Sequence, residues 1–236
     1  ELKIENGRYV MDYDDLEEKC KTAKMLILCS PHNPVGRVWT DEELLAFGDL
    51  CLRHGVRIVS DEIHADFTFE GHRHRPIASL SPALSERTVT CTAPSKTFNL
   101  AGLQVSNIWI PGNDMRGAFR REMAASGVEL VNTLGLVAAK AAYEQGEPWL
   151  REVKAYIAAN RDLFRNHLAA HLPHARLVEP EGTYLLWVDF RAYGLSHDEL
   201  TCRIVDKARL WLDDGSIFGP AGDGFQRFNI ACPRAT

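Results

Sequence analysis

The sequence lacks several features that mark whole classes of protein. Its 236 residues contain no apolar run of membrane-spanning length and no block of Lys and Arg, and the net charge is −5. A membrane-spanning protein needs such an apolar run, and binding to nucleic acid usually needs a basic patch. No signal peptide is visible. We therefore expect that this 236-residue part of the protein binds neither a membrane nor nucleic acid.

Cysteine is present, but its spacing predicts neither disulfides nor a zinc site. Several cysteines fall in apolar, strand-like segments such as LILCS, and none forms a CxxC pair. This pattern fits buried free thiols in a reducing compartment better than a disulfide framework. We therefore predict a cytoplasmic location. The six cysteines of the chain are Cys20, Cys29, Cys51, Cys91, Cys202 and Cys232.

Two further classes lack their signatures. No GxGxxG follows a predicted strand, which argues against a nicotinamide enzyme. His72 and His74 alternate with arginines and have no Cys or carboxylate at ligand spacing. Structural zinc sites need four such ligands. These histidines predict a solvated loop, and we expect no metal.

The first part of the chain alternates strand-like and helical patterns. Thr40 and Glu43 form a capping box that starts a helix, and Gly55 is placed to end it. Such alternation predicts an α/β fold, a mostly parallel sheet with helices on its faces. The strand-like segments cover residues 25–29, 56–60, 88–92 and 105–110.

The second part has a different texture. Residues 113–172 are helical in pattern, with a long helix starting near Pro148, and a smaller α+β pattern follows Pro173. There, 176–179, 183–190 and 226–231 read as strands around a helix at 197–209. We predict the end of a large domain over residues 1–146, a linking helix over 147–172 and a small domain over 173–236. We expect the chain to be truncated at both ends.

Four polar residues stand out by their context. Asn33 in SPHNPVGR, Asp61 in SDEIHAD and Lys96 in APSKTFN follow strand-like segments, and Arg227 lies in FQRFNIACPR. Each alone has an ordinary explanation as a turn residue, a helix cap or a surface charge. Ligands on parallel sheets bind at the carboxyl ends of the strands, where three of the four fall. Their combination predicts a functional site.

The segments SPHNPVGRVW, SDEIHAD and APSKTFNLAGLQ together resemble the fold-type-I pyridoxal-phosphate enzymes of the aminotransferase class I/II superfamily. Within it they are most similar to the MalY/PatB-like cystathionine β-lyases, or C–S lyases. The resemblance runs from about residue 24 to the last residue. It implies pyridoxal 5'-phosphate as cofactor, a transferase-like large domain with a smaller α+β domain, and a homodimer with sites near the subunit interface.

The resemblance also implies a role for each of the four residues. Lys96 would bond covalently to the cofactor's aldehyde, which needs a partly desolvated amine with a depressed pKa. The freed amine would then take the Cα proton and protonate the departing sulfur. Asp61 would face the pyridine nitrogen, and Asn33 would donate to the phenolic oxygen. Arg227 would hold the substrate's α-carboxylate in a bidentate fork.

Other positions are candidates by the same resemblance. His64 stands where many aminotransferases carry a tyrosine bonded to the phenolic oxygen, and it is equally open to a purely structural role. Ser95 and Thr92 are candidate phosphate contacts. Gln104 stands where the aspartate aminotransferase pattern has an arginine on the phosphate, so backbone N–H groups at a helix start would have to compensate. In the family, that loop and the ring-stacking aromatic lie N-terminal to these residues.

The predicted function is α,β-elimination of L-cystathionine or a related cysteine S-conjugate, a small amino-acid substrate, to a thiol, pyruvate and ammonia. An aminotransferase using the same residues is the first alternative, because the two reactions share their first steps. The second alternative is a transcriptional regulator whose aminotransferase-like domain senses pyridoxal phosphate.

Overall fold

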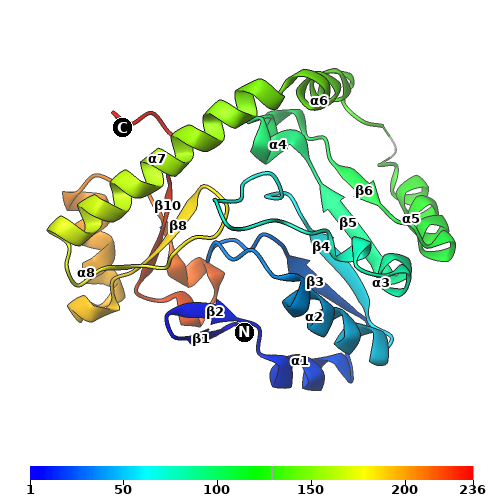
Figure 1. Ribbon diagram of the computed structural model, residues 1–236, viewed down its shortest axis with the longest axis horizontal. Coiled ribbons are helices and arrows are strands. Elements are labelled where there is room, and N and C mark those ends of the chain that lie inside the picture. Colours follow the sequence, from blue (N-terminus) through cyan, green and yellow to red (C-terminus); the bar gives the residue numbers. More distant parts are fainter. Residues whose placement is uncertain (129, 236) are drawn as a thin grey trace.

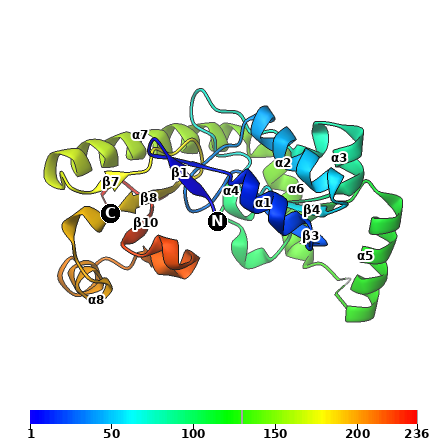
Figure 2. The same ribbon diagram turned by 90° about the horizontal axis from the view of Figure 1, so that it is seen from below.

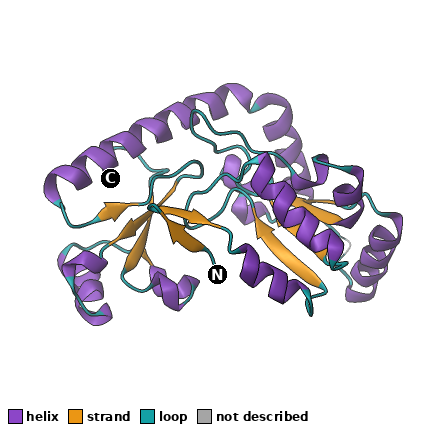
Figure 3. Ribbon diagram, turned by 60° about the horizontal axis from the view of Figure 1, so that its bottom comes forward, coloured by secondary structure: helices purple, strands orange, loops and turns teal. Residues whose placement is uncertain are grey.

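The chain folds around two separate four-stranded sheets. A computed structural model describes residues 1–128 and 130–235. The 25-residue helix α7 (Glu147–His171) runs past both sheets (Figure 1). The sheets lie on either side of the molecule, with α7 along one side of both (Figure 3).

The first sheet is mostly parallel, as predicted. Its order is β3-β4-β5-β6, with β3, β4 and β5 parallel and only β6 antiparallel to its neighbour. The strand β6 is shorter than the predicted 105–110, because it pairs with β5 only over residues 107–109. The strands are β3 (Met25–Cys29), β4 (Arg57–Asp61), β5 (Thr88–Thr92) and β6 (Asn107–Trp109).

The helix α2 (Asp41–Arg53) supplies much of the core on one face of this sheet. Thr40 and Glu43 form the predicted capping box, and the helix ends before Gly55, whose φ is +66°. Leu44, Phe47 and Cys51 recur at helical spacing and are buried in a cluster that includes residues of β3, β4 and the short helix α3 (Pro82–Arg87). Apolar burial therefore fixes α2 over the sheet.

The second sheet is antiparallel, in the order β7-β8-β10-β9. Its Leu186 is fully buried and shares a cluster with Ile157 of α7, which joins the long helix to this sheet. The very short β9 does not follow from the sequence pattern. Its elements are β7 (Arg176–Leu177), β8 (Leu185–Asp189), β9 (Asp213–Asp214), β10 (Phe225–Asn229) and the helix α8 (His197–Thr201), which continues as a wider π-helical stretch over Cys202–Lys207.

A small hairpin, formed by β1 (Lys3–Glu5) and β2 (Arg8–Val10), connects the two sheets. It lies beside both of them (Figure 2). The Tyr9 carbonyl accepts a hydrogen bond from Arg37, and Trp187 Nε1 of β8 donates to the Tyr9 hydroxyl at 3.2 Å.

We propose that the sheets are the cores of two domains divided at the predicted positions. The remaining elements are β1 (Lys3–Glu5), β2 (Arg8–Val10), α1 (Tyr13–Cys20), α4 (Pro94–Thr97), α5 (Asn113–Ser126) and α6 (Thr133–Gln145), with short 3-10 turns between.

Within residues 1–128 and 130–235, none of the helices combines the length and the apolar character that crossing a membrane requires.

Two adjacent leucines of α2 give a matched test of the first core. Leu44 is 0% exposed and Leu45 is 39% exposed. We expect Leu44→Ala to lower the free energy of unfolding by about 2–5 kcal/mol, because it leaves a cavity. Leu45→Ala should change it by about 0.5 kcal/mol or less. Urea unfolding followed by circular dichroism measures both, and equal losses would contradict the packing of α2 described above.

Candidate active site

Asp61 lies in one row with two cysteines at the carboxyl end of the parallel strands. In the strand register, Cys29 of β3 and Cys91 of β5 pair with Asp61 from either side. Burial raises the pKa of both thiols, and the negative charge of Asp61 raises it further. Both thiols therefore stay protonated at neutral pH. The Asp61 carboxyl group between them accepts a hydrogen bond from the Ile63 N–H at 3.2 Å.

The loop that carries Asn33 leaves β3 and turns toward the second sheet. The Asn33 N–H donates to the Cys29 Sγ at 3.5 Å, which holds the start of the loop to the Asp61 row. Farther on, Gly36 has a φ of +71°, and a Cβ there would lie 3.0 Å from Pro180. Its carbonyl accepts from the N–H groups of Glu181 and Gly182 at 2.8 and 3.0 Å. Glycine is needed at this close contact between the two halves.

Asn33 and Arg227 meet although 194 positions separate them. Nη1 of Arg227, on β10, donates to the Asn33 side-chain oxygen at 2.8 Å. Nε of the same guanidinium donates to Asp213 Oδ2 at 3.1 Å, Nη2 also contacts that oxygen, and the group lies 4.9 Å from the Phe218 ring centre. The Arg227 side chain is only 17% exposed. The structure thus places Arg227, the residue predicted to bind the substrate's α-carboxylate, beside the loop that carries Asn33.

His64 lies buried beside two positive charges. It is 3% exposed, its ring packs edge-on to Tyr184 at 5.7 Å, and its Nδ1 has no hydrogen-bond partner within the described residues. Burial lowers the pKa of His64 to about 4, and the charges of Lys96 and Arg227 contribute to the shift. The ring is therefore neutral at pH 7. Its surroundings place Lys96, His64 and Arg227 in one neighbourhood.

Lys96 lies on α4, directly after β5. Pro94 starts this helix, and the Thr97 hydroxyl donates to Asp66 Oδ2 at 2.6 Å, which fastens the helix to the SDEIHAD segment. Lys96 lines a pocket of about 420 Å³ whose walls include Trp149 and Tyr184. The lysine is exposed, whereas the sequence predicts a partly desolvated amine. The difference follows from the open pocket, where Trp149 itself is 46% exposed.

The other candidates lie around α4. Ser95 is half-buried on the helix, and the Thr92 hydroxyl at the end of β5 accepts from Asn107 Nδ2 at 3.4 Å. Gln104 is exposed in a left-handed turn. The roles of Ser95 and Thr92 as phosphate contacts stay predictions.

This set of groups fits pyridoxal phosphate. An amine, a carboxylate and a buried ring nitrogen that has no partner in the described part of the chain occur around one edge of the first sheet. The cofactor offers groups that match them, an aldehyde, a protonated pyridine nitrogen and a phenolic oxygen.

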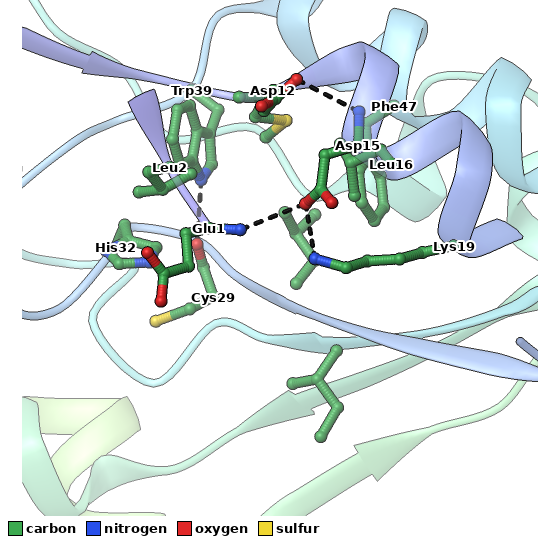
Figure 4. A pocket seen from close by; sticks show the side chains of 13 residues that line it. Glu1, Leu2, Asp12, Asp15, Leu16, Lys19, Cys29, His32, Trp39 and Phe47 are labelled. Atoms are coloured by element: carbon green, nitrogen blue, oxygen red, sulfur yellow. Dashed lines mark hydrogen bonds and ion pairs between the residues drawn. The ribbon is translucent and has the colours of Figure 1, made fainter. Parts of the chain in front are cut away.

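A second pocket, of about 300 Å³, lies beside the N-terminal residues and β3 (Figure 4). Three of its charged groups are already paired, because Asp15 binds both Lys19 and the N-terminal amine. Cys29 and His32 reach its wall, but Asn33, Asp61, Lys96 and Arg227 do not line it. The candidate chemistry therefore belongs to the Lys96 side of the sheet.

The prediction of a solvated loop is wrong for His74. Its side chain is 9% exposed, and its Nε2 lies 2.9 Å from Glu62 Oε2, while Ser60 Oγ donates to the other carboxylate oxygen at 2.8 Å. A buried carboxylate needs such partners, so His74 is drawn inward. His72 is exposed, as predicted. Within the described ranges, no group of three His, Cys, Asp or Glu side chains could hold a metal ion.

Sequence reasoning did not single out Asp66, Asp213 or Glu181. Asp66 lies within the SDEIHAD motif, so its place there is a usable signal. Asp213 and Glu181 have no comparable signal. Glu181 pairs with Arg37, which lies 144 positions away, and Asp213 pairs with Arg227 of the neighbouring strand, 14 positions away.

Comparison with known proteins decides the family. The family model for aminotransferase class I and II matches residues 4–236. The chain belongs to this family. Members of fold type I share the mostly parallel sheet seen here, which agrees with the predicted fold.

The similar proteins of the family include several C–S lyases. Cystathionine β-lyase PatB of Bacillus subtilis (strain 168) is 45% identical over 237 residues, which cover 100% of this chain and 61% of that protein. Protein MalY of Escherichia coli (strain K12) is 34% identical over 90% of this chain and 54% of its own length. Cystalysin from Treponema denticola, whose structure contains pyridoxal 5'-phosphate, superposes with a TM-score of 0.96 at 38% identity, covering 99% of this chain and 60% of cystalysin. The chain thus spans less than two thirds of these relatives' length.

The buried state of His64 predicts an acid-sensitive fold. The pKa of His64 in the fold, about 4, lies below its ordinary value of 6.5, so the unfolded chain takes up the proton first as the pH falls. We expect the free energy of unfolding to decrease from about pH 6.5 toward pH 4.

Urea unfolding at several pH values measures this dependence in the wild type and in His64→Phe. The slope should be shallower in the variant but not flat, because burial also lowers the pKa of His32 to about 4. Identical slopes would show that His64 is not held neutral.

Proposed function

We propose that the full-length protein is a pyridoxal-phosphate-dependent C–S lyase that cleaves L-cystathionine or a related cysteine S-conjugate. The observation that carries the proposal is that Arg227 meets Asn33 beside the strand end that bears Asp61, while Lys96 lines one pocket with Tyr184, the ring that packs against His64. The identity to PatB, at 45%, supports the reaction type.

In this proposal each group of the site has one task toward the cofactor. Lys96 forms the covalent bond to the aldehyde, and the Asp61 carboxylate accepts the hydrogen bond of the protonated pyridine nitrogen. Asn33 and the neutral ring of His64 contact the phenolic oxygen, and Thr92 and Ser95 contact the phosphate. When bound, pyridoxal phosphate supplies a ring that accepts the electron pair left at the substrate's Cα.

Lys96 moves the proton during elimination. Once the substrate's amino group has displaced it from the cofactor, the freed Lys96 amine would remove the Cα proton, the Cβ–S bond would break, and the same amine would return a proton to the sulfur, which leaves as a thiol. The remaining three-carbon product, 2-aminoacrylate, consumes one water and gives pyruvate and ammonia. No oxidant or reductant is needed, so the atoms and electrons balance.

Arg227 binds the other end of the amino acid. Its planar guanidinium can hold the α-carboxylate through two parallel N–H donors, which a lysine could not do. Asn33 contacts the guanidinium, so the cofactor side and the carboxylate side of the site are joined through one amide.

Transamination by the same residues is the alternative. An aspartate aminotransferase of Geobacillus stearothermophilus is 30% identical over 83% of this chain, well below the identity to PatB. The two reactions differ in whether a β-substituent leaves or the cofactor carbon is protonated. A keto-acid-dependent half reaction without pyruvate release from cystathionine would favour the alternative.

We further propose a cytoplasmic homodimer. Six free cysteines support a reducing compartment, and several large apolar side chains, including Ile27 at 73% and Trp211 at 90%, are exposed in this chain. Such residues are enriched where a surface is covered by other protein. Light scattering of the full-length protein tests the dimer, and a monomer with full activity would contradict it.

The function is tested by pyruvate release. Full-length protein loaded with pyridoxal phosphate should release pyruvate and homocysteine from L-cystathionine in equal amounts. Lys96→Ala should lower kcat by about 100-fold to 10,000-fold, because the variant loses its acid and base. It should also lose the visible–near-UV band of the bound cofactor. Lys140→Ala is the matched control, since Lys140 is a largely exposed helix residue. Normal cofactor loading without pyruvate would refute the lyase.

A further inference from the structure

We propose that Asp213 is a positioning residue that sets which edge of the Arg227 guanidinium meets the substrate's α-carboxylate. The inference rests on the proposed function, in which Arg227 binds that carboxylate. Asp213 does not itself contact substrate in this proposal. It acts through Arg227, from the neighbouring strand.

The hydrogen bonds of the guanidinium define its orientation. Arginine has five N–H donors in a fixed plane. Asp213 Oδ2 accepts from Nε at 3.1 Å and also contacts Nη2, so it occupies one side edge of the fork. The Asn33 oxygen takes one donor of Nη1 at 2.8 Å. Among the described residues, one N–H therefore remains without a partner on each terminal nitrogen, and these are the donors left for a carboxylate.

The backbone holds Asp213 at this place. In the antiparallel pair of β9 and β10, Asp213 is the register partner of Arg227 and Asp214 is the partner of Gln226. Asp214 fixes the short strand, because it accepts from Gln226 Nε2 at 2.8 Å and from the Ser216 N–H at 2.9 Å. Strand β9 thus carries one carboxylate for its own attachment and a second for Arg227.

A rival role for Asp213 is competition with the substrate. Its negative charge beside Arg227 also opposes the approach of a second carboxylate. The Asp213 side chain is 48% exposed, so water screens this repulsion. The Arg227 side chain is 17% exposed and its guanidinium lies against Phe218, so loss of a directional partner changes its orientation more than its potential. We therefore expect positioning to outweigh competition.

The test separates carboxylate recognition from all other steps. In the full-length, cofactor-loaded protein, absorbance titration gives the dissociation constants of L-alanine and of ethylamine, which is alanine without its carboxylate. Steady-state pyruvate release from L-cystathionine gives KM and kcat. The variants are Asp213→Ala, Asp213→Asn and the control Asp206→Asn, which removes an equal charge from an exposed position of the same part of the chain.

We expect Asp213→Ala to weaken L-alanine binding and raise KM about tenfold, the cost of one misaligned charge-assisted hydrogen bond. Ethylamine binding and the cofactor spectrum should stay unchanged. Asp213→Asn should recover part of the affinity, because its amide oxygen can still accept from Nε and Nη2. Should the alanine variant not fold, the asparagine variant compared with Asp206→Asn decides the matter by the same measurements.

Unchanged or tighter L-alanine binding in the folded variants would overturn the proposal, and tighter binding would identify Asp213 as a competitor. Equal losses for L-alanine and ethylamine would also overturn it, because they indicate general damage to the site. If the wild type binds L-alanine but releases no pyruvate, the lyase function fails while the positioning role is still decided by the two titrations.

Discussion

The buried ion pair of Arg37 and Glu181 holds the two sheets in a fixed relation. The Arg37 and Glu181 side chains are 1% and 9% exposed, and their charged atoms lie 2.9 Å apart. Burial raises the pKa of Glu181, but the Val38 N–H and the Arg37 charge outweigh it, so the net pKa lies below the usual range. A buried pair adds little net stability over apolar packing, yet breaking one costs about 3–5 kcal/mol. Its main effect is therefore on geometry.

That geometry determines whether the candidate site exists. Arg37 ends the loop that carries Asn33, and Glu181 precedes β8, the strand paired with β10. With these segments joined, Asn33 can be bonded at once to Cys29 on the first sheet and to Arg227 on the second. A shift of about 1 Å between the sheets would break such bonds, because hydrogen bonds weaken steeply with distance and angle. The ion pair and the site are thus parts of one constraint.

Local patterns in the sequence predict those features whose cause is local. The capping box at Thr40, the stop at Gly55 and the strands before Asp61 and Lys96 all depend on neighbouring residues, and the structure has them. Arg37 and Glu181 look like ordinary surface charges, because charged residues are almost never buried unless paired. Their pairing spans 144 positions. Asp213 and His74 have partners only 14 and 12 positions away, but these pairings depend on how the chain turns back between the two residues, which the local pattern does not predict.

The neutral state of His64 explains how two cations can share this small site. Lys96 lies on α4 and Arg227 on β10, and both influence the same ring. A charged imidazole between them would add a third positive charge in a buried place, which burial and repulsion both oppose. The neutral ring instead offers one donor and one acceptor without changing the net charge. In the proposed reaction Arg227 binds the carboxylate and the Lys96 amine acts at the reacting carbon, and the contact between the sheets sets the spacing between those two tasks.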